Sequence, residues 1–341
     1  MQSSQLDISG ALNSKVEVLM IKSNSIPKYD EQHYAVVDLG SNSFHLAISQ
    51  LNSNNGLTII NKVKQKVRLA AGLTSDNLLT TEAMTRGLLC LEIFAEHLSS
   101  IPKENIIIVA TAALRIARNK DDFINQANCI LPREIQLLSG EQEASTIYAG
   151  VAYTDKENVE HSIKHKTRLV LDIGGASTEI IVGEGNSANK LVSLNIGCVS
   201  FINHYFADSL LTDTNFKQCI EAASDEIRTV SQAYKKLGWQ SALGSSGTMQ
   251  AMAEILTFQH KPAIITLAFL QEVKQKLIDC KTIDNITIEG LRSDRSAVLA
   301  SGLSILIALF NELAITSMQL STGALREGLL SQLLPDAHII K

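Results

Sequence analysis

The stretch LVLDIGGASTEIIVG, residues 169–183, places an aspartate and two glycines between two apolar runs. Residues 36–48, VVDLGSNSFHLAI, repeat this plan 134 positions earlier, with Asp38 at the place of Asp172 and Gly40 at the place of Gly174. Apolar runs of this length around a glycine turn are typical of two buried strands joined by a tight corner. Two copies, each opening a long segment, predict two related domains that face each other across a cleft.

Both corners carry groups that suit phosphate. A glycine turn exposes backbone N–H groups without a Cβ in the way, and Ser or Thr hydroxyls add donors. The aspartate at each strand end offers the carboxylate oxygens that Mg²⁺ prefers, so Asp38 and Asp172 are candidate metal ligands. The expected phosphate contacts are Ser41, Asn42 and Ser43 in the first corner, and Gly174, Gly175, Ala176, Ser177 and Thr178 in the second.

A third glycine loop, LGSSGTM, follows the strand WQSAL and precedes an expected helix that runs to about Ile255. A helix that begins at such a loop presents free N–H groups and the positive end of its dipole, which favour anions. Taken alone, the loop is explained equally well as an ordinary helix cap. Beside the two corners, phosphate binding is the better interpretation, through Ser245, Ser246, Gly247 and Thr248.

Composition excludes several other classes of protein. With 341 residues, 45% hydrophobic content and a formal net charge of −5, the chain can build a large core but lacks a general nucleic-acid or membrane surface. Five scattered cysteines without a C-x-x-C pair predict neither disulfides nor a zinc site, and they fit a reducing cytoplasm. The apolar residues 296–311 number 16, fewer than the roughly 20 of a spanning helix, which predicts a buried helix.

Strands and helices alternate from about residue 34, which predicts an α/β fold with mixed sheets. The polar run at 154–167 marks a boundary, and residues 1–32 lack the pattern of a secretory signal. The expected parts are therefore a loose arm at 1–32, a first domain at 33–153 and a second domain at 154–341 that includes the C-terminal helix.

The elements expected in the first domain are strands at 33–40, 44–51, 57–70 and 106–115, and helices at 81–100, 123–128 and 141–153. The second domain predicts strands over about 169–195, a long helix near 215–236, a strand at 239–244 and helices to the end.

Seven segments, in order, resemble the exopolyphosphatase and guanosine pentaphosphatase family: DLGSNSFH (38–45), RLAAGL (68–73), ATAALR (110–115), SGEQEA (139–144), DIGGASTE (172–179), GSSGT (244–248) and STGALREGLL (321–330). The resemblance covers about residues 33–334. It implies two ribonuclease-H-like domains of the actin-like ATPase superfamily around a central cleft. It also implies hydrolysis of a terminal phosphoanhydride with Mg²⁺.

The resemblance further implies roles for four side chains. Glu143 falls at the place of the family's general base, Asp172 and Glu179 at its metal and phosphate carboxylates, and Arg115 at its phosphate-contacting arginine. Phosphoryl transfer needs a proton acceptor for water, a divalent cation and donors for the phosphate oxygens. The residues alone leave another role open for Glu143, because an acid near a helix start also favours the dipole or completes a cap with Ser139.

Several basic residues are further candidates. Lys62, Lys64 and Lys66 share one strand face, for which solvation is the simpler interpretation. Arg68, in a segment that resembles the family, and Arg295, in a charged turn ahead of the apolar helix, are candidate phosphate contacts.

Three positions depart from the repeat or from the family pattern. His45 stands at the repeat position of Glu179, and it either lines the cleft or packs. Ala176 replaces a third glycine, and its methyl group would be strained if that backbone needs a positive φ. Gln142 replaces an acid that often precedes the base, so a lower pKa for Glu143 or a weaker metal contact is expected.

These features predict a two-domain cytoplasmic phosphatase that releases terminal phosphate from inorganic polyphosphate, from guanosine pentaphosphate or from both. Mg²⁺ is the expected cofactor, with a monovalent cation such as K⁺ as a further candidate. A kinase or nucleotide hydrolase of the same fold, and a non-catalytic phosphate or alarmone sensor, stay open as alternatives. Longer members of the family carry a further helical region, so we expect a short form that is less processive. A homodimer is the candidate assembly, and neither nucleic acid nor a membrane is an expected partner.

Overall fold

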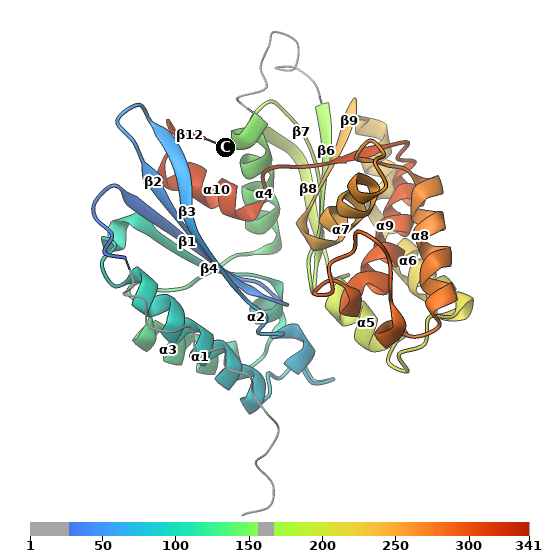
Figure 1. Ribbon diagram of the computed structural model, residues 1–341, viewed down its shortest axis with the longest axis horizontal. Coiled ribbons are helices and arrows are strands. Elements are labelled where there is room, and N and C mark those ends of the chain that lie inside the picture. The colour runs from blue at the N-terminus through green and yellow to red at the C-terminus, as the bar shows by residue number, and fades with distance from the viewer. Residues whose placement is uncertain (1–26, 156–166, 341) are drawn as a thin grey trace, which may run out of the picture.

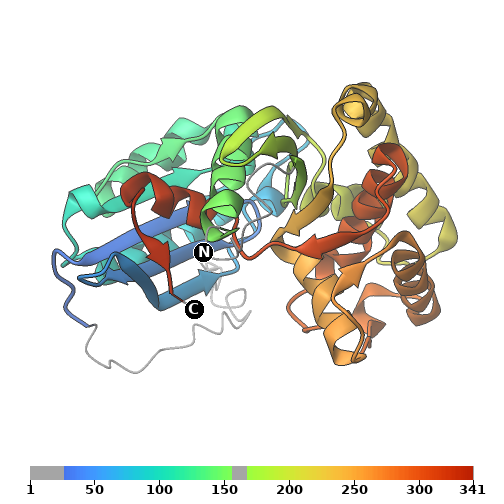
Figure 2. The same cartoon turned by 90° about the horizontal axis from the view of Figure 1, so that it is seen from above.

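The computed structural model describes residues 27–155 and 167–340, which form two lobes (Figures 1 and 2). Each lobe is built on a six-stranded mixed sheet, with the order β12-β3-β2-β1-β4-β5 in the first and β10-β11-β9-β6-β7-β8 in the second. The first sheet comprises β1 His33–Leu39, β2 Phe44–Leu51, β3 Gly56–Gln65, β4 Ile106–Ala110, β5 Gln136–Leu137 and β12 His338–Ile339. The second comprises β6 Thr167–Ile173, β7 Thr178–Glu184, β8 Ser187–Leu194, β9 Ser241–Ser245, β10 Ile264–Ile265 and β11 Met318–Leu320.

The two sheets repeat one topology. In the first, β1 pairs antiparallel with β2 and parallel with β4, while β2 pairs antiparallel with β3. In the second, β6 pairs antiparallel with β7 and parallel with β9, while β7 pairs antiparallel with β8. The register also repeats, because Asp38 lies opposite His45 and Asp172 lies opposite Glu179. The α/β fold with mixed sheets and the repeated corner predicted from the sequence are therefore confirmed.

Helices cover both faces of each sheet (Figure 1). The first half contributes α1 Thr81–Leu98, α2 Ala112–Ile116, α3 Lys120–Ile130 and α4 Gly140–Asp155. The second half contributes α5 Cys198–Tyr205, α6 Asp213–Leu237, α7 Ser246–Phe258, α8 Leu267–Cys280, α9 Ser296–Leu313 and α10 Leu325–Leu333. Helices α4 and α10 lie between the sheets, where Ile147 and Leu329 share one apolar cluster with Val36 of β1 and Val170 of β6. The helices between the lobes therefore join both sheets into one structure.

The C-terminal segment returns to the first lobe. Helix α10 packs on α4 and β1, and β12 pairs with β3 at the edge of the first sheet. The approach of α10 is close, since a Cβ at Gly328 would lie 1.9 Å from the carbonyl oxygen of Thr146 in α4. Glycines on α4 and α10 let the two backbones meet, so this helix, which the sequence analysis counted with the second domain, packs against α4 and β1 of the first lobe.

Helix α9 is long and apolar enough to span a membrane by length and composition, and it is the one helix with this property in residues 27–155 and 167–340. It packs inside the second lobe against α5, α6 and α8, and 72% of its residues are buried there. The prediction of a buried helix over residues 296–311 is confirmed.

Several boundaries differ from the sequence-based expectation. The segment 106–115 was predicted as one strand, but β4 ends at Ala110 and α2 begins at Ala112, because Ala and Leu favour a helix once sheet pairing stops. The strand predicted over 57–70 ends at Gln65, and Arg68 has a φ of 53°. The expected arm and linker fall largely on residues 1–26 and 156–166, outside the described residues, whereas Tyr29 is buried in the first lobe.

Candidate active site

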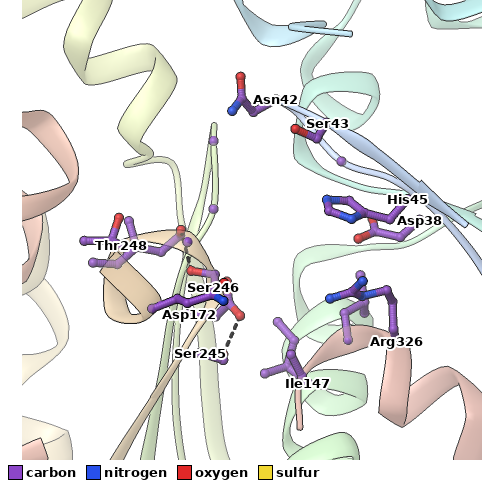
Figure 3. A pocket seen from close by; sticks show the side chains of 18 of the residues that line it. Asp38, Asn42, Ser43, His45, Ile147, Asp172, Ser245, Ser246, Thr248 and Arg326 are labelled. Atoms are coloured by element: carbon purple, nitrogen blue, oxygen red, sulfur yellow. Dashed lines mark hydrogen bonds between the residues drawn. The ribbon is translucent and has the colours of Figure 1, made fainter. Parts of the chain in front are cut away.

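The two corners meet at one cleft between the lobes. The first corner, residues 40–43, joins β1 to β2, and the second corner, residues 174–177, joins β6 to β7. They approach so closely that a Cβ at Gly175 would lie 2.8 Å from the Cβ of Ser41. Both corners line a cleft of about 400 Å³ (Figure 3). Glycine at position 175 is therefore required by space, and the paired corners can contact one ligand.

Hydrogen bonds fix the first corner from several directions. The hydroxyl oxygen of Ser41 accepts the amide of Ala113 at 3.1 Å, and its carbonyl accepts the amide of Ala70 at 2.8 Å. The carbonyl of Asn42 accepts the amide of Arg68 at 2.8 Å. With its oxygen held in this way, the Ser41 hydroxyl keeps its proton for a ligand in the cleft.

The third loop, residues 244–248, packs against the second corner. The hydroxyl of Ser245 donates to Asp172, and that of Ser246 donates to the carbonyl of Ile173 at 2.8 Å. Ser246 has a φ of 70°, a conformation that non-glycine residues seldom adopt, at the start of α7. Helix α7 therefore points its free N–H groups into the cleft beside Asp172.

Arg295 covers this loop. A Cβ at Gly247 would lie 2.1 Å from its Nη1 atom, so glycine is needed there for space. Its Nη2 atom donates to Gln250 at 2.9 Å. Burial lowers the pKa of Arg295, and Arg292 adds repulsion, but a guanidinium stays charged at neutral pH. The structure thus places a fixed positive charge at the start of α7.

Two buried aspartates stand at the strand ends. Asp38 lies on the wall of the first corner and Asp172 on the opposite wall (Figure 3). Burial raises the pKa of Asp38 to about 6, with a counteracting effect of Arg326 and a further rise from Asp172. Burial likewise raises the pKa of Asp172 to about 6, although bonds from Ser245 and Ser246 oppose the shift. A bound cation would therefore stabilise the ionised form of both carboxyl groups.

The donor set fits a divalent cation of the Mg²⁺ type. The Oδ1 atom of Asp38 is buried and has no hydrogen-bond partner among the described residues, an arrangement that a cation would satisfy. Residues 27–155 and 167–340 contain no group of three or more His, Cys, Asp or Glu side chains placed for a metal. Mg²⁺ binds through one or two carboxylates and completes its shell with water and phosphate oxygens, so two carboxylates such as those of Asp38 and Asp172 would be enough to hold it.

Glu143 extends into the cleft from the first turn of α4. The cap of this helix is made by other residues: Ser139 Oγ accepts the amide of Gln142 at 3.1 Å, and Gln142 Oε1 accepts the amide of Ser139 at 2.8 Å. This reciprocal pair is a capping box, so the capping role that the sequence left open for Glu143 belongs to Gln142. The Glu143 carboxylate is left for the cleft.

Arg115 holds Glu143 in place. Its Nη1 atom donates to Glu143 Oε2 at 2.8 Å and to the Leu138 carbonyl at 3.1 Å. Burial nevertheless raises the pKa of Glu143 to about 7, because it outweighs the opposing bond and charge of Arg115. Gln142 carries no charge and is engaged in the helix cap, so the pKa of Glu143 is governed by burial and by Arg115. A carboxylate with a pKa near neutrality suits a general base.

A hydrogen-bonded network links Arg115 of the first lobe to Ser193 and Glu179 of the second lobe. Nη2 of Arg115 contacts the Ser193 hydroxyl at 3.4 Å, and that hydroxyl donates to Glu179 at 2.7 Å. Glu179 is buried and does not line the cleft, and burial together with the charge of Glu143 raises its pKa. In this structure Glu179 therefore orients Ser193 and, through it, Arg115. A direct metal contact, as the resemblance implies, would need a shift of its side chain.

Most sequence-predicted residues share the cleft, and those that line it are Asp38, Ser41, Asn42, Ser43, Glu143, Asp172, Gly174, Gly175, Ser177, Ser245, Ser246, Gly247, Thr248 and Arg295.

Five sequence-predicted residues lie outside the cleft lining. Arg115 and Glu179 act through the network just described. The Arg68 side chain is exposed, and this residue contributes its amide to the first corner. Thr178 donates to the Ile196 carbonyl at 2.7 Å. Ala176 is buried and does not have a positive φ, so its methyl group imposes none of the strain that the sequence analysis considered.

Sequence reasoning missed Arg326. Its guanidinium lies beside Asp38 and His45 on the first wall (Figure 3), and it lowers the pKa of both groups. Arg326 follows the loop 321–324 at the start of α10, a stretch quoted for the resemblance without a role for any residue. A charged residue two positions after a run of four small residues was the available signal.

The cleft rim carries further charged and polar residues. His45 lines the cleft, and burial lowers its pKa to about 3, so it is neutral. Lys62 and Lys64 also line the cleft, although the sequence favoured a solvated strand face. Lys64 lies 3.3 Å from a carboxylate oxygen of Asp294, and Lys66 donates to the Asp294 carbonyl at 2.8 Å. These contacts join β3 to the loop before α9, across the cleft.

The amino-acid sequence of this chain is similar to those of known phosphatases. The profile of the Ppx/GppA phosphatase family matches residues 47–337. Guanosine-5'-triphosphate,3'-diphosphate pyrophosphatase of Pseudoalteromonas translucida is 50% identical over 305 residues, which cover 89% of this chain and 60% of that protein. The protein of the same name from Aeromonas hydrophila is 46% identical over 305 residues, with the same shares of each chain.

Solved structures agree on the fold. An exopolyphosphatase from Cytophaga hutchinsonii matches with a TM-score of 0.78 at 22% identity, covering 90% of this chain and 99% of that chain. The Aquifex aeolicus member of the Ppx/GppA family matches with a TM-score of 0.71 at 21% identity and the same coverage. These matches agree with the two-lobed α/β fold of this chain. The chain spans about 60% of the length of the curated relatives it matches. By its sequence profile and its fold, the chain belongs to the Ppx/GppA phosphatase family.

Proposed function

We propose that the protein hydrolyses terminal phosphoanhydride bonds, with guanosine pentaphosphate as the favoured substrate and inorganic polyphosphate as a second one. One observation carries the proposal: the Glu143 carboxylate, fixed by Arg115 at 2.8 Å, reaches the same cleft as the two opposed phosphate corners. The names of relatives at 46–50% identity support the choice of guanosine pentaphosphate. Free thiols at all five cysteines support a reducing cytoplasm as its place of action.

In the proposed reaction, the terminal phosphoryl group lies between the corners. The oxygen of a water attacks its phosphorus, Glu143 accepts the water's proton, and the bridging P–O bond breaks to release inorganic phosphate and a shortened substrate. Backbone N–H groups of both corners and of the α7 start bind the phosphoryl oxygens. Arg326 and Arg295 add positive charge where the transition state accumulates negative charge.

The remaining residues position these groups. Mg²⁺, held by Asp38 and Asp172, would neutralise phosphate oxygens next to the scissile bond. Arg115 keeps Glu143 directed into the cleft, and Glu179 keeps Ser193 in contact with Arg115. Neutral His45 can donate one hydrogen bond toward the cleft without adding charge to a wall that already holds Arg326.

Ala176 and Gln142, the two departures from the family pattern that leave a non-catalytic sensor open, have structural explanations. Ala176 occupies an ordinary backbone conformation in the core, and Gln142 caps α4. Neither residue lines the cleft, so neither removes a phosphate-binding or metal-binding group from it. A kinase or nucleotide hydrolase shares this fold, and a test of substrates separates it from the proposed phosphatase.

We expect purified protein with Mg²⁺ to release phosphate from guanosine pentaphosphate and from short polyphosphates, and to turn over ATP at least tenfold more slowly. The measurement is phosphate release at equal substrate concentrations, with tripolyphosphate, longer polyphosphates, guanosine pentaphosphate and ATP side by side. Binding of these anions without any release would support a sensor. Preferred turnover of ATP would support the nucleotide hydrolase.

A further inference from the structure

A second pocket continues the cleft along one face of α7. It has a volume of about 510 Å³, within the range of small-molecule sites, and it shares Gln250 and Leu320 with the active-site cleft. Gln250, Glu254 and Phe258 follow one another at four-residue spacing, so they lie in a row on the same side of the helix. The row begins where Arg295 donates to Gln250, one turn beyond the phosphate loop.

The far part of this pocket presents an exposed aromatic ring. Phe258 is 53% exposed, although it is a large apolar residue at the end of a helix. Gly290, with a φ of 82°, packs under it, since a Cβ there would lie 2.5 Å from the Cβ of Phe258. Leu320 on the other side is 36% exposed. A ring that packs against Gly290 at its base and is more than half exposed offers a face on which a flat ring system can stack.

A carboxylate lies one turn before that ring. Glu254 Oε2 is buried and makes no hydrogen bond among the described residues, although the Nε atom of Arg292 lies 3.3 Å away. The Glu254 side chain is still 25% exposed and lines the pocket. Arg292 therefore fixes the carboxylate through its buried Oε2 atom, and the exposed part of the Glu254 side chain is left for the pocket. A ligand that presents N–H donors can hydrogen-bond to this exposed part of the carboxylate.

We infer that this pocket binds the guanine base of the substrate, stacked on Phe258 and held through its N1–H and N2–H groups by Glu254. Guanine places these two donors side by side, so both can approach the carboxylate oxygen that Arg292 leaves accessible. Adenine offers one amino donor beside an acceptor nitrogen, which a carboxylate repels, so Glu254 would select guanine. The subsite rests on the proposed function, because it receives the nucleoside end of that substrate.

The spacing agrees with this assignment. Gly247 and Glu254 are seven residues apart on α7, which corresponds to about 10 Å along the helix axis. The sugar and the inner phosphate of a nucleotide span a similar length between the base and the outer phosphates. Inorganic polyphosphate would use the cleft alone, which predicts that changes in this pocket affect nucleotides and leave phosphate chains unaffected.

The test measures equilibrium binding, which does not require turnover. The probes are the imido analogues of GTP and ATP and inorganic imidodiphosphate, titrated into the full chain with Mg²⁺ by calorimetry. We expect the wild type to bind the GTP analogue at least tenfold more tightly than the ATP analogue. Phe258→Ala should weaken binding of the GTP analogue roughly 5- to 150-fold, the range found when a stacked aromatic is truncated. Glu254→Gln should remove the preference for guanine.

Two control variants distinguish the effects of lost stacking and lost charge on binding from the effect of a general change in structure. Phe258→Trp keeps a stacking face and should retain binding, and Glu289→Gln removes a nearby exposed carboxylate outside the pocket and should bind as wild type. All variants should bind imidodiphosphate equally. Unchanged binding of the GTP analogue in both Phe258→Ala and Glu254→Gln would overturn the inference, as would equal binding of the two nucleotides by wild type. Guanine-selective binding without phosphate release would retain the subsite and refute the proposed hydrolysis.

Discussion

Glu143→Gln should lower turnover of guanosine pentaphosphate by roughly 10²–10⁴-fold, the loss expected when a general base is removed. Glutamine keeps the shape of the side chain and a contact with Arg115 but cannot accept the proton of water. The fold should be retained, because Gln142 and Ser139 cap α4 without help from Glu143. Initial rates of phosphate release at saturating substrate, beside thermal unfolding curves, check both parts of this expectation.

The pH dependence of kcat/KM should also identify Glu143 as the general base. Glu143 acts as a base only when it is deprotonated, and burial raises its pKa to about 7. The wild-type kcat/KM should therefore rise as pH increases through about 7 and level off above it, and in Glu143→Gln this rise should disappear. Glu141→Gln is the matched control, since it removes an exposed acid from the same helix turn. Loss of activity in Glu141→Gln as large as that in Glu143→Gln would show that the helix dipole, and not base catalysis, explains Glu143.

Asp38→Asn should lower turnover by about 10²–10³-fold and raise the Mg²⁺ concentration needed for half-maximal activity. The Oδ1 atom of Asp38 is buried without a hydrogen-bond partner among the described residues, and asparagine supplies no negative charge for the cation. Titration of activity with Mg²⁺ for wild type and variant measures this effect.

The Asp38→Asn substitution should lower turnover without lowering the stability of the folded protein in the absence of metal. Because burial raises the pKa of Asp38 from 3.8 to about 6, ionisation is less favourable in the folded protein than in the unfolded chain. The resulting loss of stability develops as pH rises above about 4 and is complete above about 6, so without metal the Asn variant should be at least as stable as wild type at pH 7. A variant that unfolded more easily but kept its Mg²⁺ requirement would assign Asp38 a structural role.

The corners were predictable because their signal is local. Continuous apolar runs, an aspartate at the strand end and a glycine turn occur within 15 consecutive residues, and the same pattern occurs twice in the sequence. Because both corners carry the same kinds of groups, Asp38 and Asp172 were expected on opposite sides of one cleft. Both residues line the same cleft in the structure. The third loop was predicted in the same way, from a strand, two serines and a glycine ahead of a helix.

Other parts of the site depend on contacts between distant segments. Arg326 reaches the cleft because α10 crosses back to the first lobe, and no local pattern encodes that return. The division of roles between Gln142 and Glu143 depends on which side chain reaches the Ser139 backbone, and both are compatible with a helix start. Arg68 was misassigned because its positive φ turns the chain at a place where the sequence continues a strand pattern.

The central claim is that two like corners, one from each lobe, bind the same phosphate chain. A crystal structure with imidodiphosphate and Mg²⁺ tests it most directly. The account predicts phosphate oxygens within hydrogen-bond distance of backbone amides from both 40–43 and 174–177, with the terminal phosphorus facing Glu143. An anion bound to one corner only, or outside the cleft, would contradict it.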